Sequence, residues 1–217
     1  MTKYSLVLFD FDGTLMNTSL GIFDTLNYVM KILDREIDEN CNINKFIGPP
    51  LSVCFSEVMG LEEDLVENAM DIYRKRYKEK GQYIAEFYEG IIPLLSWLKT
   101  TEMKVAVATL KNAVLAESMA SYFGIMSYMD GIFGMTSNSE KENKAQIIEN
   151  ALDYFKIKPE KAVLIGDTLL DFQGAREVGL DFIGAGFGFG FNNDVDAKHS
   201  DILMAKDCSQ IRSLLED

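Results

Sequence analysis

The chain has 217 residues, 47% of them hydrophobic, and a formal net charge of -13. This length and apolar content suit one core domain that carries a sizeable insertion. The negative charge argues against a nucleic acid polymer or an anionic membrane as the main partner. Because no stretch resembles a secretion signal or a membrane span, we expect a cytoplasmic protein.

The first predicted element is a buried strand, Ser5–Phe9, which runs into the acidic turn Asp10–Leu15 (DFDGTL). Side chains two residues apart in an extended segment point the same way, so Asp10 and Asp12 converge. Such a pair suits a hard cation with oxygen ligands, most naturally Mg²⁺, which brings a phosphate with it. On its own, the turn also fits a surface loop in which Asp and Gly satisfy backbone groups.

Residues 17–86 interrupt the alternation of strands and helices, because they contain no convincing strand. Two helices with apolar stripes are predicted instead, one through Leu20, Phe23, Leu26, Met30 and Leu33, the other through Leu65, Ala69, Ile72, Tyr73 and Tyr77. Between them, Phe46–Leu51 (FIGPPL) predicts a rigid turn that starts a short helix. The chain therefore leaves the core after its first strand, builds a helical module and returns near Phe87.

The rest of the chain alternates buried strands with amphipathic helices. Further strands are predicted at Met103–Ala108, Gly131–Met135, Ala162–Ile165 and Phe182–Ala185. Helices are predicted at Ile91–Leu98, Ala145–Phe155 and Phe172–Val178. This alternation predicts an α/β fold with a parallel sheet covered on both faces. The stretch Gly184–Gly190 indicates a loop, because it lacks the following helix that a dinucleotide fingerprint requires.

Polar residues stand where two of these later strands end. Thr109 follows a strand and precedes a helix, so its hydroxyl and nearby backbone N–H groups suit a phosphate. Alone, Thr109 also fits the N-cap of that helix. Asp167 ends another buried strand and is a candidate to form a Mg²⁺ cradle with Asp10.

An acid and a lysine complete the candidate site. Asp171 lies four residues after Asp167, where its carboxylate also favours the N-terminus of the next helix. Lys144 precedes a predicted helix and would neutralise the clustered carboxylates, and Lys141 competes for the same role.

Taken in order, these residues resemble the four motifs of the haloacid dehalogenase superfamily of phosphatases. The motifs are matched by Asp10–Leu15, Thr109, Lys144 and Gly166–Asp171. Asn143–Ile148 is similar to the third-motif segment, which favours Lys144 over Lys141. The resemblance covers essentially the whole chain and implies a Rossmann-like core, residues 1–16 and 87–217, with an inserted helical cap of the C1 type, residues 17–86. Phe46–Leu51 resembles the phosphoglycolate phosphatase-like subgroup.

The resemblance also implies the chemistry and the roles of the residues. Asp10 is expected to attack phosphorus and form an aspartyl-phosphate, while Asp12 serves as acid and then base. Thr109 and Lys144 are expected to orient and neutralise the phosphate. The implied Mg²⁺ site consists of Asp10, Asp12 through its carbonyl, Asp167 and Asp171. The expected substrate contacts are Gly13, Thr14, Leu110, Ile47, Gly48 and Pro49.

The expected substrate is a small phosphorylated metabolite, with phosphoglycolate as the default. A 5'-nucleotidase-type phosphatase and a β-phosphoglucomutase-like phosphomutase stay open as alternatives. A haloacid dehalogenase would not need an acid at Asp12, and a non-catalytic binding module would be expected to have lost Asp10, Asp12 or Asp167. We expect a monomer or a weak homodimer.

Overall fold

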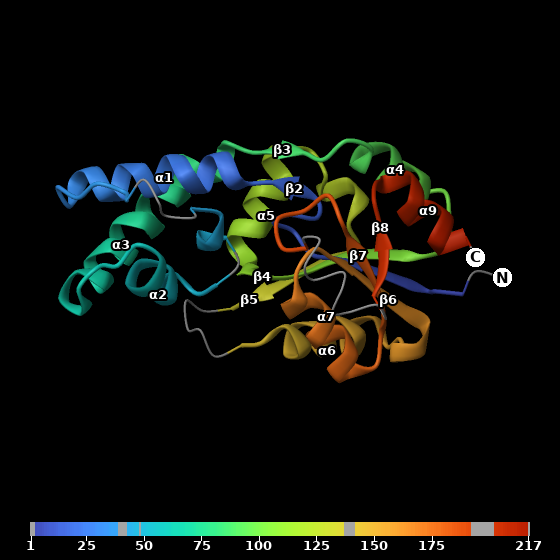
Figure 1. The fold of residues 1–217 in the computed structure, drawn as a ribbon. Helices are drawn as coiled ribbons and strands as arrows, with labels where there is room; N and C mark the ends of the chain where they lie inside the picture. Colours follow the sequence, from blue (N-terminus) through green and yellow to red (C-terminus); the bar gives the residue numbers. More distant parts are fainter. Residues whose placement is uncertain (1–2, 39–42, 48, 137–141, 192–201, 217) are drawn as a thin grey trace. The chain divides into compact units, whose positions relative to one another are not determined.

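The computed structural model describes residues 3–38, 43–47, 49–136, 142–191 and 202–216 (Figure 1). The chain divides into two compact units, one made of Met1–Asn17 and Phe87–Asp217 and the other of Thr18–Glu86. Within the described residues, no helix is both long enough and apolar enough to cross a membrane.

The first unit is built on a parallel sheet. Its described strands are β1 (Leu6–Phe9), β4 (Lys104–Asn112), β5 (Gly131–Met135), β6 (Ala162–Gly166), β7 (Asp181–Ala185) and β8 (Leu203–Ala205). They lie in the order β5-β4-β1-β6-β7-β8, and all neighbouring pairs are parallel. The predicted α/β class with a parallel sheet is confirmed.

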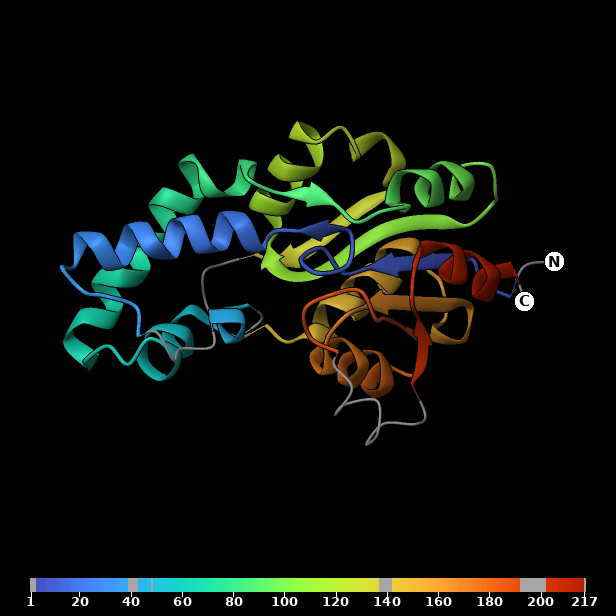
Figure 2. The same cartoon turned by 45° about the horizontal axis from the view of Figure 1, so that its top comes forward.

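Helices cover both faces of this sheet. On one face lie α6 (Lys144–Phe155) and α7 (Leu169–Val178), and on the other α4 (Ile91–Leu98), α5 (Ala113–Tyr122) and α9 (Cys208–Glu216) (Figures 1 and 2). Each layer of helices buries its apolar side chains against one face of the sheet, which is why the strands are apolar on both faces.

Strand β1 shows how the sequence produces this core. Its four side chains are fully buried, and alternate ones point to opposite faces. Leu6 and Leu8 pack in one cluster with Ile148 and Ala151 of α6 and with Leu164 of β6. Burying each such side chain contributes about 1.5–3 kcal/mol, so the strand that carries the acidic turn is held firmly.

The strand order places β1 at the point where the chain changes direction across the sheet. Phe9 at the end of β1 lies opposite Val107 in β4 and Ile165 in β6. From β1 the chain builds β4 and β5 on one side, and then crosses to build β6 and β7 on the other. In open α/β sheets, ligands bind at the carboxyl ends of strands beside such a switch point.

The second unit is helical. It contains α1 (Ser19–Ile32), the short α2 (Leu51–Val53), a π-helical turn at Cys54–Val58, and α3 (Glu63–Glu79). Four aromatic side chains pack together in its interior, with neighbouring ring centroids 5.2–6.0 Å apart: Phe46, Phe55, Tyr73 and Tyr77. These four aromatic residues therefore serve as packing inside the unit.

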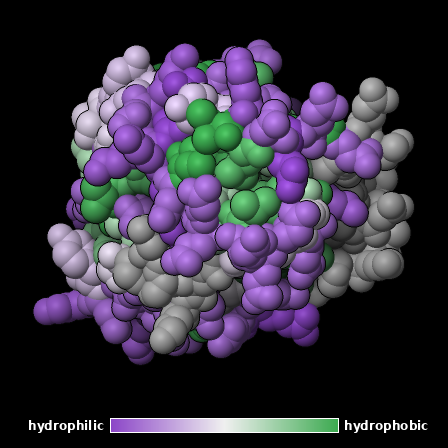
Figure 3. Space-filling model, turned by 90° about the vertical axis from the view of Figure 1, so that its left-hand side faces the viewer, coloured by the Kyte–Doolittle hydropathy of each residue, from purple (hydrophilic) through white to green (hydrophobic). Residues whose placement is uncertain are grey.

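The predicted apolar stripe on α1 is wrong in part. Leu26 and Met30 are buried as predicted, but the buried face continues through Ile22 and Val29, and Leu20 is 55% exposed. Other large apolar side chains of this unit that stay exposed are Tyr28, Ile32 and Tyr83. The face drawn in Figure 3 carries a patch of apolar side chains ringed by polar ones.

Two very short strands stand where the chain passes from one unit to the other. β2 (Met16–Asn17) and β3 (Glu86–Phe87) pair as a two-stranded sheet. The expectation of no strand in residues 17–86 therefore fails at both ends of that segment. Strands of two residues lack the alternating pattern by which a strand is recognised in sequence.

Candidate active site

Asp10 is the first residue after β1, and a buried lysine holds its carboxylate. The Asp10 backbone N–H donates to the Ile165 carbonyl at 2.8 Å, which continues the sheet by one residue. The Lys144 ammonium donates to Asp10 Oδ1 at 2.6 Å and lies equally close to Asp171 Oδ1. Lys144 thus joins the ends of two distant segments.

The start of α6 places Lys144 at this point. Asn143 caps the helix through its side chain, which accepts from the Gln146 backbone N–H, and in return the Asn143 backbone N–H donates to the Gln146 side-chain oxygen. The lysine is the first residue of the helix rather than the residue before it. Its predicted competitor, Lys141, lies outside the described residues.

Three buried carboxylates meet at the carboxyl end of the sheet. One oxygen each from Asp10, Asp167 and Asp171 lie within 4.8 Å of one another. Asp171 also serves its own helix, because its Oδ2 accepts from the Thr168 backbone N–H at 3.0 Å and from the Thr168 hydroxyl at 2.6 Å. Both interpretations of Asp171, as helix N-terminal acid and as cluster member, agree with its position.

Asp167 is enclosed by hydrogen bonds on both of its oxygens. Oδ1 accepts from the Thr14 hydroxyl at 3.1 Å, and Oδ2 accepts from the Phe189 backbone N–H at 2.8 Å. Gly13 lies against the same carboxylate with φ +86°, and a Cβ there would come within 3.0 Å of it. Thr14, predicted to contact substrate, therefore bonds Asp167 through its hydroxyl.

Burial and mutual repulsion disturb the protonation of this cluster. Desolvation, followed by the charges of Asp10 and Asp171, raises the pKa of Asp167 to about 8. Desolvation also raises the pKa of Asp10, although Lys144 opposes it. Burial alone would lower the pKa of Lys144, but Asp10 and Asp171 outweigh burial and raise it. Lys144 is therefore charged, but its single positive charge does not balance the three carboxylates.

The donor set fits a divalent hard cation. Asp10, Asp167 and Asp171 offer only carboxylate oxygens, and Lys144 supplies one positive charge against their three negative ones. Two formal negative charges are left in a buried site, which is the charge that Mg²⁺ neutralises. Oxygen donors without thiolate or imidazole favour Mg²⁺ over zinc.

Asp12 has a lysine partner that the motif analysis missed. The Lys111 ammonium donates to both oxygens of Asp12, at 3.0 and 2.9 Å, and both side chains are largely buried. Lys111 comes from β4, two residues after Thr109, whose Oγ1 accepts from the Lys111 backbone N–H at 3.2 Å. No local signal in the sequence marks Lys111, because its position depends on the extension of β4 past Thr109, where the strand register shifts before Asn112.

The structure corrects the environment of Thr109. Strand β4 continues to Asn112, four residues beyond its predicted end. The cap of α5 is Asn112, whose side chain accepts from the Val114 and Leu115 backbone N–H groups, so Thr109 is not the N-cap. Thr109 is buried in the strand beside β1, with its side chain 2% exposed.

The remaining predicted substrate contacts are divided between the two units, with Leu110 in the core unit and Ile47 and Pro49 in the 18–86 unit. The Leu110 side chain packs against the apolar cluster that contains Leu8 and Ile148. A contact with a ligand would therefore have to come from the Leu110 backbone. Ile47 is half-buried and Pro49 exposed in the 18–86 unit, and Gly48 lies outside the described residues.

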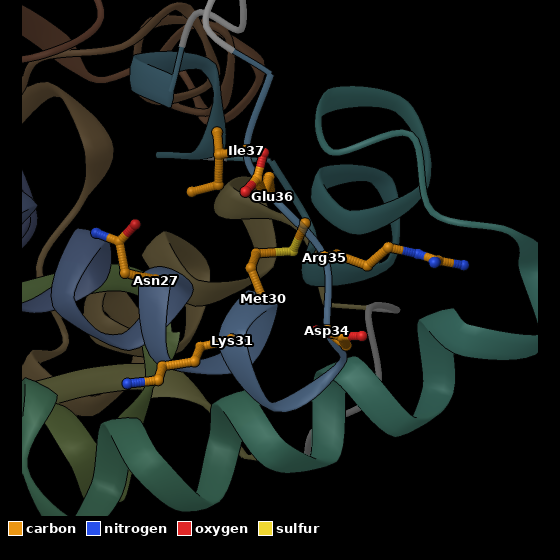
Figure 4. Close-up of a pocket in the computed structure, with 7 residues that line it drawn as sticks. All are labelled: Asn27, Met30, Lys31, Asp34, Arg35, Glu36 and Ile37. Atoms are coloured by element: carbon orange, nitrogen blue, oxygen red, sulfur yellow. The ribbon is translucent and has the colours of Figure 1, made fainter.

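An open pocket of about 630 Å³ in the 18–86 unit contains none of the candidate acids (Figure 4). It is lined by Asn27, Met30, Lys31, Asp34, Arg35, Glu36 and Ile37. The charged ends of Lys31 and Arg35 point away from its centre in Figure 4, and Arg35 pairs with Glu62 at 3.5 Å. The pocket contains none of the three clustered carboxylates, so we place the candidate active site at the carboxyl ends of the sheet strands.

Comparison with known proteins finds a matching family model and relatives that are named as a nucleotidase, as phosphatases and as a tyrosine-protein kinase. A family model described as haloacid dehalogenase-like hydrolase matches residues 7–185. The chain is 31% identical over 214 residues to a 5'-nucleotidase of Pseudomonas aeruginosa, covering 99% of this chain and 96% of that protein. It is 28% identical over 173 residues to a phosphoglycolate phosphatase of Aquifex aeolicus, with 80% of each covered. A haloacid dehalogenase-like family hydrolase from Streptococcus pneumoniae superposes with a TM-score of 0.88, at 33% identity and 99% coverage of both chains.

The raised pKa of Asp167 predicts how the stability of the metal-free protein depends on pH. Because its pKa is about 8 in the folded protein against an ordinary value of 3.8, the unfolded chain loses this proton first. Stability is therefore lost as the pH rises from about 4 to about 8. Asp167→Asn removes this penalty, since an Asn oxygen can accept from Phe189 and its amide can donate to Thr14.

We expect Asp167→Asn to raise the melting temperature in EDTA at pH 8 by about 4 °C or more, and by less at pH 5. Adding Mg²⁺ should raise the melting temperature of the parent protein but not that of the variant. Thermal unfolding followed by circular dichroism measures both. A variant that melts below its parent in EDTA at pH 8 would show that the carboxylate is not under strain.

Proposed function

The chain belongs to the haloacid dehalogenase-like hydrolase family and is a phosphatase of that family, and from this premise we propose that it hydrolyses small phosphate monoesters with Mg²⁺ through an aspartyl-phosphate on Asp10. One observation carries the proposal. A carboxylate at the end of a central strand is held by a buried ammonium group inside an acidic cluster. This arrangement combines a nucleophile with the charge compensation that an anionic substrate needs.

Asp10 carries the first chemical step. Lys144 binds its Oδ1, which fixes the carboxylate and leaves Oδ2 to attack the phosphorus atom. A bond forms between Asp10 and phosphorus while the bond to the leaving oxygen breaks. Lys144 lowers the repulsion between the anionic nucleophile and the anionic phosphate, and the Thr109 hydroxyl orients the phosphoryl oxygens.

Asp12 carries the proton transfers. It donates a proton to the leaving oxygen in the first step and accepts one from the attacking water in the second. That water breaks the bond between Asp10 and phosphorus and releases inorganic phosphate. Lys111 contacts both oxygens of Asp12, and so it holds the side chain in one orientation before substrate arrives.

Mg²⁺ would be held by Asp10, Asp167 and Asp171, with the Asp12 carbonyl as a further ligand. When bound, it supplies positive charge that stabilises the transferring phosphoryl group. The glycine and threonine that follow Asp12 contribute by shaping this site, because Gly13 lets the chain pass close to Asp167 and Thr14 bonds it.

The residues between 18 and 86 supply specificity in this proposal, and phosphoglycolate is the default substrate. A substrate carboxylate needs a cation, and two arginines of α3 are candidates. However, Arg76 already pairs with Asp24 at 3.0 Å and lies 4.6 Å from the Tyr28 ring, while Arg74 pairs with Asp71 at 3.4 Å. Because both guanidinium groups already pair with acidic side chains, they are less suited to bind a carboxylate of the substrate.

A nucleoside monophosphate is the second candidate substrate. It is supported by the 5'-nucleotidase relative, which matches nearly the full length of both chains. Phosphate release from phosphoglycolate, nucleoside monophosphates and sugar phosphates, measured with and without Mg²⁺, ranks these candidates. Isomerisation of glucose 1-phosphates would indicate a mutase instead, and a protein that releases phosphate from no monoester would contradict the proposal.

The nucleophile assignment predicts that Asp10→Asn abolishes turnover. An amide is too weak a nucleophile to attack phosphorus, and the loss of charge also weakens one Mg²⁺ ligand. The fold should persist, because the substitution relieves repulsion in the acidic cluster. Phosphate release and circular dichroism measure the two effects, and acid-quenched reactions with ³²P-labelled substrate should label the parent protein only. Turnover by Asp10→Asn near the parent rate would refute the assignment.

The Asp12–Lys111 pair predicts a selective loss of rate in Lys111→Met. We expect kcat on an alkyl phosphate to fall about tenfold or more, since misplaced general acid–base groups forfeit part of their ~10²–10⁴-fold contribution. Lys104→Met is the matched control. Lys104 lies on the same strand, is 54% exposed and pairs with Asp130 at the opposite end. Equal rates in the two variants would mean that Lys111 does not position Asp12.

The proposed specificity role of residues 46–51 predicts a change of substrate ranking in Ile47→Ala. Its side chain is half-buried in the 18–86 unit, whereas the clustered acids belong to the other unit. The variant should reorder kcat/KM values across a panel of phosphate monoesters while its Mg²⁺ dependence stays as in the parent. If the ranking is unchanged, the specificity residues lie elsewhere in the unit.

A further inference from the structure

A segment rich in glycine and phenylalanine lies against Asp167, although the proposed chemistry does not use it. After β7 the chain reads Gly186-Phe187-Gly188-Phe189-Gly190-Phe191. The backbone N–H groups of Phe189 and Gly190 donate to Asp167 Oδ2 at 2.8 and 3.3 Å. These are contacts from a loop to a carboxylate more than twenty residues away in the sequence.

Two glycines of this segment, Gly188 and Gly190, face Asp167. A Cβ on Gly188 would lie less than 3.0 Å from the Asp167 side chain and from the Gly13 carbonyl oxygen. A Cβ on Gly190 would lie less than 3.0 Å from the Asp167 carbonyl oxygen. Gly188 does not have a positive φ, so glycine is required there for space and not for backbone conformation.

The phenylalanines face the other way and anchor the segment. The Phe187 and Phe189 rings lie 5.0 and 6.3 Å from the Tyr88 ring, between centroids. Phe191 is buried and packs on Phe182 at 6.2 Å. The alternation of small and large side chains thus keeps one edge of the loop on Asp167 and the other on aromatic partners.

We propose that Gly188–Gly190 is a positioning element that fixes the orientation of the Asp167 carboxylate and thereby sets the affinity of the site for Mg²⁺. The inference rests on the proposed function, which makes Asp167 a metal ligand. With two N–H groups on Oδ2 and the Thr14 hydroxyl on Oδ1, the carboxylate cannot rotate about its Cβ–Cγ bond without breaking bonds at both ends. Hydrogen bonds of this kind orient metal ligands and raise metal affinity.

The test is Mg²⁺ binding to the substrate-free protein, measured by titration calorimetry. Gly188→Ala should raise the Kd for Mg²⁺ by about 10–100-fold, the usual effect of disturbing partners of metal ligands. Gly186→Ala is the matched control, because its Cβ would meet no atom nearer than 3.2 Å and none of Asp167. It should bind Mg²⁺ within about twofold of the parent.

A second variant covers the case in which Gly188→Ala does not fold. Phe189→Ala keeps the backbone N–H but loses the packing on Tyr88, and it should raise the Kd for Mg²⁺ by a smaller factor. Parent-like Mg²⁺ affinity in a folded Gly188→Ala protein, or in Phe189→Ala when the first variant is unfolded, would overturn the inference. A parent protein that binds Mg²⁺ but hydrolyses no phosphate ester would refute the proposed function and leave the positioning role supported.

Discussion

The repulsion among three carboxylates buried around one lysine is the constraint on which the rest of the core unit depends. One carboxylate oxygen each of Asp10, Asp167 and Asp171 lie within 4.8 Å of one another, and Lys144 pairs with Asp10 and Asp171. Burial makes each charge harder to hold, which is why the pKa of Asp167 rises to about 8. A site like this persists only if the surrounding fold opposes its tendency to open.

The fold opposes it by attaching each charged group to a rigid element. Asp10 extends the fully buried β1, Asp167 follows β6, and Lys144 begins a helix with a complete capping box. β1 lies between β4 and β6 in the sheet. Neither Asp10 at the end of β1 nor Asp167 after β6 can therefore move without disturbing the sheet. The burial of the apolar interior stabilises the fold, and this stability offsets the repulsion among the like charges at the strand ends.

The sequence predicted the residues whose signals are local and left out those whose positions depend on the rest of the chain. Asp10 and Asp167 stand directly after apolar runs, and acids in such places have few structural explanations. Lys111 was missed because β4 continues past Thr109, an extension stabilised by pairing with β5 that no local pattern reveals. Gly188 was interpreted only as part of a loop, since nothing in the sequence shows which side chain a loop will contact. Leu20 illustrates the same limit on α1, because which face of α1 is buried depends on its packing against α3.

The pairing of β2 with β3 has a consequence for how such enzymes diversify. The chain leaves and re-enters the core at adjacent points, so a 69-residue helical excursion is inserted as if into a single turn. Its loss or exchange would leave every strand of the large sheet with its neighbours unchanged. The excursion can therefore change in length and in sequence without changing which strands carry the clustered acids.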